Sequence, residues 1–411
     1  MRLLFVLFVF QLSLLALTLE EAIDKVANNN LDIKIANQDT FATQRKLSQR
    51  KFSSFGTIDL LSSFSTYNDE RTLAPIAPPI TNDIVTSKSI ASVGVGYKVN
   101  LFNGMKTFND IEIDQLFVSV AQAKQKLTGY EQVYMIQSLY LNILSLQKIL
   151  HSQEKHKEAL EHLKSALKES VKHGKKPEID LLKIDSQIYK TMEQITVLQT
   201  KVNILKSTLS SIMYGEIKKI EELEDIDISY KQKNYVLENI PSLQIAQHTL
   251  KKSDKAFQNA LASYYPQVNF QASYVNNYGN GSKENVSTAI VNLEWRAFDF
   301  GAREEGVQLA KIEKTKTVTI AKKTRLEYEN KIYEAKEKIV QNEQLLKSRE
   351  SEFLVATKIK EVEELKYNEG QSSINDFLFA SADEKLSQSK YIEAKYKLIE
   401  SQFYFEFLIK E

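Results

Sequence analysis

The chain lacks cysteine, contains few glycines and prolines, and carries almost no net charge. With no cysteine among 411 residues, structural disulfides, thiol catalysis, cysteine-ligated metals and a lipid-modified N-terminal cysteine are excluded. Only 12 glycines and 6 prolines occur, so long stretches run without a helix breaker. The 54 basic and 53 acidic residues nearly cancel, which is unlike the basic surface of a nucleic-acid-binding protein, so no nucleic-acid partner is predicted.

Residues 1–17 are predicted to be a signal peptide. Met1 and Arg2 precede a mostly apolar run from Leu3 to Leu17. A charged start followed by an apolar segment of this length is typical of secretion signals, and the run is short for a membrane-spanning helix of about 20 residues. An uncleaved membrane anchor is the alternative. Either interpretation places the rest of the chain outside the cytoplasm.

The remainder consists of two similar halves, which we assign to residues 18–214 and 236–411, joined by a linker at 215–235. The segment GKKPEIDLL at 174–182 resembles GQSSINDFL at 370–378, 196 residues later. Earlier in each half, FGTI at 55–58 resembles YPQV at 265–268, 210 residues later. The offsets differ because the first half carries a longer loop at 68–88. Such internal similarity indicates a repeated architecture.

Each half is predicted to contain a helix, two strands, a long helix and a return helix. The first helix opens with a capping box at Thr18 and Glu21 and continues to about Phe52. Its counterpart is expected at about 236–264. The long helices are expected at about 103–172 and 299–367, each roughly 100 Å long at about 1.5 Å per residue. The return helix after Pro177 has apolar residues alternately three and four apart, as in coiled coils.

Four strands are predicted, at about 57–67, 90–101, 267–275 and 287–298. Apolar and polar residues alternate along the last three, as in Ala91, Val93 and Val95 against Ser92 and Gly94, and the first strand is less regular. Alternation over about ten residues is typical of membrane β-strands. Four strands cannot close a membrane barrel, and open edges in lipid leave backbone groups unpaired. Protomers must therefore pool strands, eight from two or twelve from three. The predicted fold class is mainly α with a small β part.

Four motifs carry a resemblance to a known family: LTLEEAI at 17–23, LFNG at 101–104, AFDFG at 297–301 and YNEGQSSINDFL at 367–378. In this doubled layout they resemble the TolC outer-membrane efflux protein family. The resemblance implies a homotrimer with a 12-stranded barrel in outer-membrane lipid and a helical periplasmic tunnel. It also implies docking to a periplasmic adaptor (membrane fusion) protein and an inner-membrane pump, in a tripartite efflux or type I secretion system.

The resemblance places the periplasmic entrance at the two helix turns. Tyr367 and Asp180 match a tyrosine and an aspartate that hold the entrance shut in close members, while Ser372 stands at the position of an arginine. Asp376 matches the first of two aspartate rings, and Phe379 stands at the second. Both aspartates equally fit a stabilising role at a helix N-terminus, beside the helix dipole.

The turns themselves are predicted to contact the adaptor. The residues concerned are Gly174, Lys175, Gly370 and Gln371. The alternative for the two glycines is a plain helix C-cap, where glycine adopts the left-handed conformation.

No enzyme, cofactor or metal site is predicted. His151, His162 and His173 share one helix face, but neighbours lie roughly 16 Å apart by helical rise, too far to bind one metal ion. The leading function is a passive outer-membrane exit duct. The alternative is a periplasmic coiled-coil scaffold without transport, and the alternating strands argue against it because a scaffold needs no lipid-facing strand.

Overall fold

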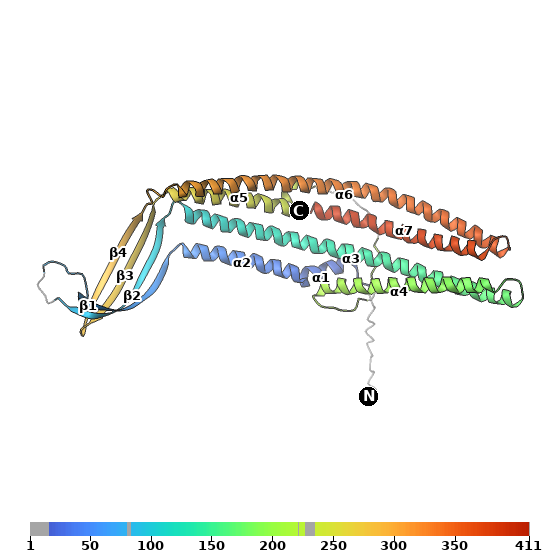
Figure 1. Cartoon of the computed structure of the whole chain (residues 1–411), viewed down its shortest axis with the longest axis horizontal. Helices are drawn as coiled ribbons and strands as arrows, with labels where there is room; N and C mark the ends of the chain where they lie inside the picture. The colour runs from blue at the N-terminus through green and yellow to red at the C-terminus, as the bar shows by residue number, and fades with distance from the viewer. Residues whose placement is uncertain (1–15, 80–83, 221, 227–234, 411) are drawn as a thin grey trace, which may run out of the picture. The chain divides into compact units, whose positions relative to one another are not determined.

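The structure is a computed structural model that describes residues 16–79, 84–220, 222–226 and 235–410 (Figure 1). Residues 1–15 of the predicted signal peptide and parts of the predicted linker lie outside the described residues. The chain forms two compact units. The sheet unit consists of Ala36–Gln125 and Pro241–Leu326. The coiled-coil unit consists of the described residues within Met1–Ile35, Lys126–Ile240 and Glu327–Glu411. Each unit draws on both halves of the sequence.

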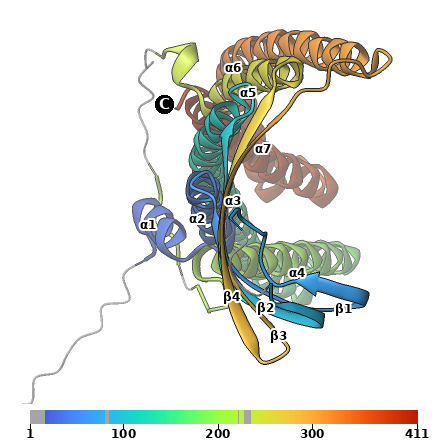
Figure 2. The same ribbon diagram turned by 90° about the vertical axis from the view of Figure 1, so that its left-hand side faces the viewer.

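One antiparallel sheet lies in the sheet unit, with the strand order β1-β2-β3-β4 (Figure 2). The register aligns the predicted apolar faces, since Tyr97 pairs with Ile58 on one side and with Ala272 on the other. Such cross-strand pairs of apolar side chains stabilise a sheet. The strand bounds are β1 (Thr57–Thr72), β2 (Thr86–Phe102), β3 (Gln267–Gly279) and β4 (Ser282–Glu294).

The strand ends differ from the prediction. β3 and β4 extend to a two-residue turn at Asn280 and Gly281, both with positive φ, so the pairing continues until Gly279 meets Ser282. An Asn-Gly turn of this kind suits the twist of a hairpin. At the other end β4 stops at Glu294 and not at Phe298, because its partner β3 begins at Gln267, opposite Glu294.

The predicted long loop is shorter than expected and is anchored at one point. β1 and β2 extend into it, with a register shift between Thr66 and Arg71. Leu73 is buried, and its carbonyl accepts a hydrogen bond from the Asn277 side chain of β3 at 2.6 Å. The described residues that follow, 75–79, are exposed.

Two long helices have the same length. α3 (Lys106–Lys172) and α6 (Ala302–Asn368) each contain 67 residues, and they begin 196 residues apart. Each starts about three residues later than predicted, because Gly104 and Met105 before α3, and Phe300 and Gly301 before α6, have positive φ and cannot continue a right-handed helix. The return helices are α4 (Ile179–Tyr214) and α7 (Ile374–Leu408).

The first predicted helix is two helices. α1 (Leu19–Asn29) has the expected capping box of Thr18 and Glu21, but it ends before Asn30, and α2 (Leu31–Ser53) begins after it. The Asn30 side chain caps α2 by accepting from the Ile33 amide, and it donates to Gln132 and to the Ile212 carbonyl. Asn30 is buried, so these bonds replace its lost water contacts.

The counterpart in the second half begins at the equivalent position. α5 (Pro241–Leu261) starts 210 residues after α2, with proline at its first position, where the missing amide hydrogen costs nothing. Short 3₁₀ helices flank it, η1 (Leu237–Asn239) and η2 (Ala262–Tyr264).

The main core of the coiled-coil unit joins α1, α3, α4 and α7 around fully buried side chains such as Tyr140 and Leu209. Two polar contacts fix the chain segment 222–226 onto this core. The Tyr140 hydroxyl lies within hydrogen-bond distance of the Leu17 and Glu224 carbonyls, at 2.6 and 2.8 Å. Tyr396 donates to the Asp225 carboxylate at 2.8 Å, which also pairs with Lys148.

Asp225 is ionised when it binds the segment 222–226 to the core. Burial acts to raise its pKa, but the hydrogen bonds from Lys148, Tyr396 and the Ile226 amide outweigh burial, and the pKa lies below its ordinary value. The carboxylate therefore stays charged and bonded at neutral pH.

Candidate functional site

The two helix turns of the coiled-coil unit have the same backbone geometry. Gly174 and Gly370 have φ of 70° and 77°. In the first turn the Gly174 and Lys175 amides donate to the Val171 and Ser170 carbonyls, each at 2.9 Å. In the second, the Gly370 and Gln371 amides donate to the corresponding carbonyls of Tyr367 and Lys366, at 3.1 and 2.8 Å. This pattern of two backbone hydrogen bonds at a helix end is a Schellman motif.

The predicted C-cap role of both glycines is therefore present. A Cβ atom added at either glycine would meet nothing within 4 Å, so backbone conformation and not space requires glycine there. Gly174, Lys175, Gly370 and Gln371 are all exposed. Adaptor contact at these turns stays a prediction.

Tyr367 lies at the centre of a small apolar cluster at this end of the unit, and it is only 5% exposed. Its ring stacks on Phe377, with centroids 6.0 Å apart and planes 16° from parallel. Its hydroxyl is buried and has no hydrogen-bond partner among the described residues. Burial, and after it the negative charge of Asp180, raise the pKa of Tyr367. The structure thus brings Asp180 and Tyr367 together without a hydrogen bond at the hydroxyl.

A lysine that the sequence reasoning missed joins the two turns. The Lys176 ammonium lies 4.1 Å from the centroid of the Tyr367 ring and donates to the Tyr367 carbonyl at 3.2 Å. A cation over an aromatic face is attracted by the ring quadrupole. Lys176 aligns with Ser372 at the offset of 196, so the first half carries a cation where the second half lacks its arginine. The repeat alignment contained this signal.

Asp376 is a capping residue in the structure. Its carboxylate accepts from the Ser373 amide and hydroxyl at 3.2 and 2.6 Å, while its own amide donates to the Ser373 hydroxyl. The hydrogen bond from the Ser373 hydroxyl contributes most to lowering the pKa of Asp376. Ser372 donates to Glu363 at 2.7 Å. Asp376 remains exposed, so capping leaves its charge available to solvent.

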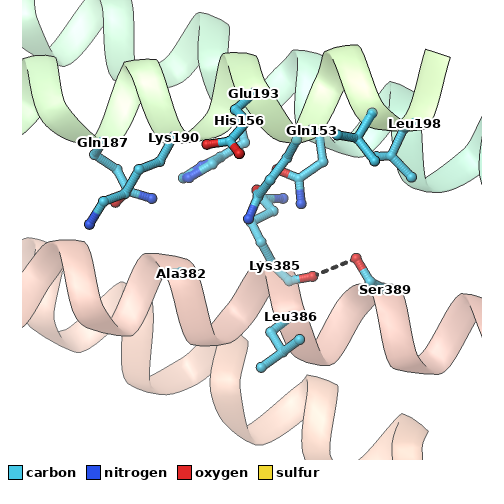
Figure 3. A pocket seen from close by; sticks show the side chains of 12 residues that line it. Gln153, His156, Gln187, Lys190, Glu193, Leu198, Ala382, Lys385, Leu386 and Ser389 are labelled. Atoms are coloured by element: carbon cyan, nitrogen blue, oxygen red, sulfur yellow. Dashed lines mark hydrogen bonds between the residues drawn. The ribbon is translucent and has the colours of Figure 1, made fainter. Parts of the chain in front are cut away.

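A cavity of about 510 Å³ lies further along the same unit, between α3, α4 and α7. Figure 3 shows Gln153 and His156 of α3 facing it, with Gln187, Lys190 and Glu193 on α4 and Lys385 and Ser389 on α7. A second cavity of about 250 Å³ on the α6 side is also lined by His156 and Lys385. The buried His156 therefore borders both cavities, and its Nε2 has no partner in the part of the chain that the structure describes.

Among the described residues, no three histidine, cysteine, aspartate or glutamate side chains are grouped to hold a metal ion. Within the same residues, no helix combines the length and the apolarity needed to cross a membrane. The cavity beside His156 is lined largely by amide, lysine and aliphatic side chains.

The chain is similar to outer membrane proteins in part of its sequence and in its fold. The family model for outer membrane efflux proteins matches residues 234–403. No curated protein sequence matches the chain. Among solved structures, the outer membrane protein VceC from Vibrio cholerae has a TM-score of 0.82 at 12% identity and covers 95% of both chains.

Two further structures are outer membrane channels. The Campylobacter jejuni CmeC channel has a TM-score of 0.79 at 16% identity, covering 95% of this chain and 85% of its own. The open state of the Neisseria gonorrhoeae MtrE channel has a TM-score of 0.81 at 13% identity, covering 95% and 88%.

The chain therefore has the mainly helical fold, with a small antiparallel sheet, of outer membrane channels. The family model confirms the resemblance to an outer-membrane efflux protein family over residues 234–403, and the solved structures show the same fold. The matching family and the structures are channel proteins of the outer membrane and not enzymes.

Proposed function

We propose that three copies of this chain form an outer-membrane exit duct. The observation that carries the proposal is the four-stranded sheet with two free edges: among the described residues, β1 pairs only with β2, and β4 only with β3. Unpaired backbone groups are not tolerated in lipid, so the edges require partner strands. Pairing β4 of one protomer with β1 of the next, around a threefold axis, gives a closed barrel of twelve strands.

Exposed apolar side chains on the coiled-coil unit support assembly. On α6, Tyr333, Val340 and Leu354 are exposed and lie seven and fourteen residues apart, on one face. On α4, Leu182 and Tyr189 are exposed with the same spacing. Contiguous exposed apolar residues mark protein contacts, and heptad spacing suits helix pairing. We assign these faces to protomer contacts that enclose a periplasmic tunnel.

We assign the gate to the turn region of the coiled-coil unit. Lys176 and Tyr367 connect the first turn to the second, and Asp180 adds a negative charge beside the ring. Threefold symmetry would turn Asp376 into a ring of three carboxylates, which favours cations at a constriction. The exposed Phe379, one helical turn further on, would add an apolar ring. Closure by packing is favoured, since the Tyr367 hydroxyl has no hydrogen-bond partner in the described part of the chain.

The turns at Gly174–Lys175 and Gly370–Gln371 are the surfaces that we assign to the periplasmic adaptor. They are exposed, and an added side chain atom would meet only solvent. The duct is a passive conduit, so the energy for export comes from the inner-membrane pump that the adaptor connects to it. Tripartite efflux and type I secretion use the same kind of duct, and both fit this chain.

Native mass measurement in detergent, combined with planar-bilayer recording, tests the proposal. The expected result is a trimer that conducts ions. A coiled-coil scaffold predicts no conductance at any oligomeric state. A monomer or a dimer would contradict the shared twelve-stranded barrel directly.

A further inference from the structure

The larger cavity beside His156 has the features of a small-molecule site. Its volume of about 510 Å³ lies within the range of about 300–1,000 Å³ that is common for ligand pockets. The lining residues come from α3, α4 and α7 of the coiled-coil unit, so one chain forms the cavity without a partner protomer. The proposed gate uses none of these lining residues.

The floor of the cavity presents a buried polar group. His156 is 5% exposed, and its Nε2 atom has no hydrogen-bond partner in the described part of the chain. Buried polar atoms are normally hydrogen-bonded, because they have lost their contacts with water. Figure 3 shows the imidazole near Gln153, facing the space between α4 and α7. Its Nε2 atom is therefore available to a molecule that binds in the cavity.

The charged side chains around the cavity favour an anion. Lys190 of α4 and Lys385 of α7 line it, against one glutamate, Glu193. The Lys385 ammonium lies 3.3 Å from the Glu384 carboxylate and donates to Gln388 at 3.0 Å. An ammonium group has three hydrogens, so one of them remains for a ligand.

The titration of His156 indicates the sign of the potential at the floor. Burial, and after it the positive charges of Lys385 and Lys360, lower the pKa of His156 to about 4. The ring is therefore neutral at neutral pH, and with its hydrogen on Nε2 it donates to an acceptor. The positive potential that disfavours the imidazolium ion also disfavours a cationic ligand and favours an anionic one.

Aliphatic side chains complete the walls. Val197 and Leu198 line the cavity from α4, and Ala382 and Leu386 line it from α7. Val197 and Leu386 are exposed, at 47% and 53%. An inorganic anion such as sulfate would leave this apolar surface in contact with water, whereas an organic molecule would cover it. The lining therefore suits a molecule that has both an anionic group and an apolar body.

We propose that this cavity binds a small organic carboxylate with an apolar body. The carboxylate accepts hydrogen bonds from His156 Nε2 and from the Lys385 ammonium, and the apolar body lies against Val197 and Leu386. Hydrogen bonds to an ionised acceptor are stronger than those between neutral groups. The site goes beyond the proposed duct, because it requires neither the barrel nor the assembly of three chains.

Equilibrium dialysis of the full-length protein in detergent, with 2-naphthoate as the probe, tests the proposal. Neutral 2-naphthamide and cationic 2-naphthylmethylammonium carry the same rings, so they separate the effect of charge from that of apolar contact. We expect the protein to bind 2-naphthoate at least about fivefold more tightly than 2-naphthamide. The cation should not be retained above the level of detergent alone.

Two variants identify the site. His156→Leu removes the Nε2 donor, and Lys385→Met removes the ammonium but keeps the aliphatic stem. Each should weaken the binding of 2-naphthoate by about tenfold. His151→Leu makes the same replacement at an exposed position of α3 and should bind like the parent. Circular dichroism checks that each variant is folded, and Lys385→Met, at a partly exposed residue, tests the site even if His156→Leu does not fold.

Three results would overturn the proposal. The first is equal binding of 2-naphthoate by the parent and by the folded variants. The second is binding of 2-naphthamide or of the cation as tight as that of 2-naphthoate. The third is no retention of 2-naphthoate by the parent above the level of detergent alone. Dialysis requires no conductance, so failure of this site is distinguished from failure of the duct, which native mass measurement and planar-bilayer recording detect.

Discussion

His156 illustrates what one buried residue does to the pH response of this protein. Burial, and then the charges of Lys385 on α7 and Lys360 on α6, lower its pKa from the ordinary 6.5 to about 4. Those lysines are themselves paired, Lys385 with Glu384 and Lys360 with Glu364. The nearest α4 charges around the cavity are Lys190 and Glu193. The surroundings therefore favour a neutral imidazole.

The sign of the effect follows from linkage. Between about pH 6.5 and pH 4 the unfolded chain binds a proton at His156 and the folded chain does not. The contribution of His156 to the free energy of unfolding is therefore fully present above about pH 6.5. It is lost as the pH decreases, by up to about 3 kcal/mol. We expect the melting temperature to fall between about pH 7 and about pH 5. The fall should be smaller in His156→Gln, as followed by circular dichroism.

His151→Gln is the matched control, because His151 lies on the same helix and is exposed. It should lose stability with falling pH as the parent does. Equal losses in His156→Gln and the parent would assign the acid sensitivity to other groups.

At the scale of elements, Asn30 decides that α1 and α2 are separate helices. The amino-acid pattern continues as a helix across this position, but a buried asparagine side chain bonds to α2, α3 and α4 residues at once. Those bonds require the chain to leave the helical conformation, and ψ at Asn30 is 133°.

We expect Asn30→Ala to lower the free energy of unfolding by about 1–3 kcal/mol, because it removes a helix cap and leaves the Ile212 carbonyl without this donor. Asn28→Ala is the control. Asn28 is exposed, and its side chain donates to the Asp24 carbonyl of its own helix, so its loss should cost less than about 0.5 kcal/mol. Similar losses for both variants, measured by chemical denaturation, would contradict the assigned role of Asn30.

At the scale of the whole molecule, we expect the contacts at the two turns to set how far the proposed duct stays closed. The stack of Tyr367 on Phe377 lies across the second turn, and the Lys176 ammonium joins the first turn to it. A cation–π contact contributes about 1 kcal/mol. Each such contact that is lost should raise the ratio of open to closed states by a factor of about five.

Single-channel recording tests this expectation. Lys176→Met, which keeps the aliphatic stem, and Tyr367→Ala should both increase mean conductance. Tyr367→Phe is the control, because the tyrosine hydroxyl has no partner among the described residues and the ring stack survives. An increase in Tyr367→Phe as large as in Tyr367→Ala would show that a hydrogen bond, formed in the assembly, closes the duct.

The sequence determined the element order and most of the helix bounds, because periodicity and caps are local. Period-two alternation placed the last three strands, and Thr18 with Glu21 placed the start of α1. Turn glycines marked the C-terminal ends of the long helices, whose starts were predicted about three residues too early. Two predicted bounds were wrong because they depend on residues distant in the sequence. The helix breaks at Asn30 because its side chain bonds to other helices, and β4 ends at Glu294 because its partner strand begins opposite that residue. Neither can be read from neighbours in the chain.

The candidate site was likewise predicted from the sequence only in part. Tyr367, Asp180 and the turn glycines follow from motifs and their spacing, since each lies within a few residues of a turn. The capping bonds of Asp376 to Ser373 are local as well. The position of Lys176 over Tyr367 and the unpartnered nitrogen of His156 among the described residues depend on packing between helices far apart in sequence. Only the tertiary structure decided them, because the free energy of a contact depends on distance, burial and neighbouring charge, and chain order specifies none of these.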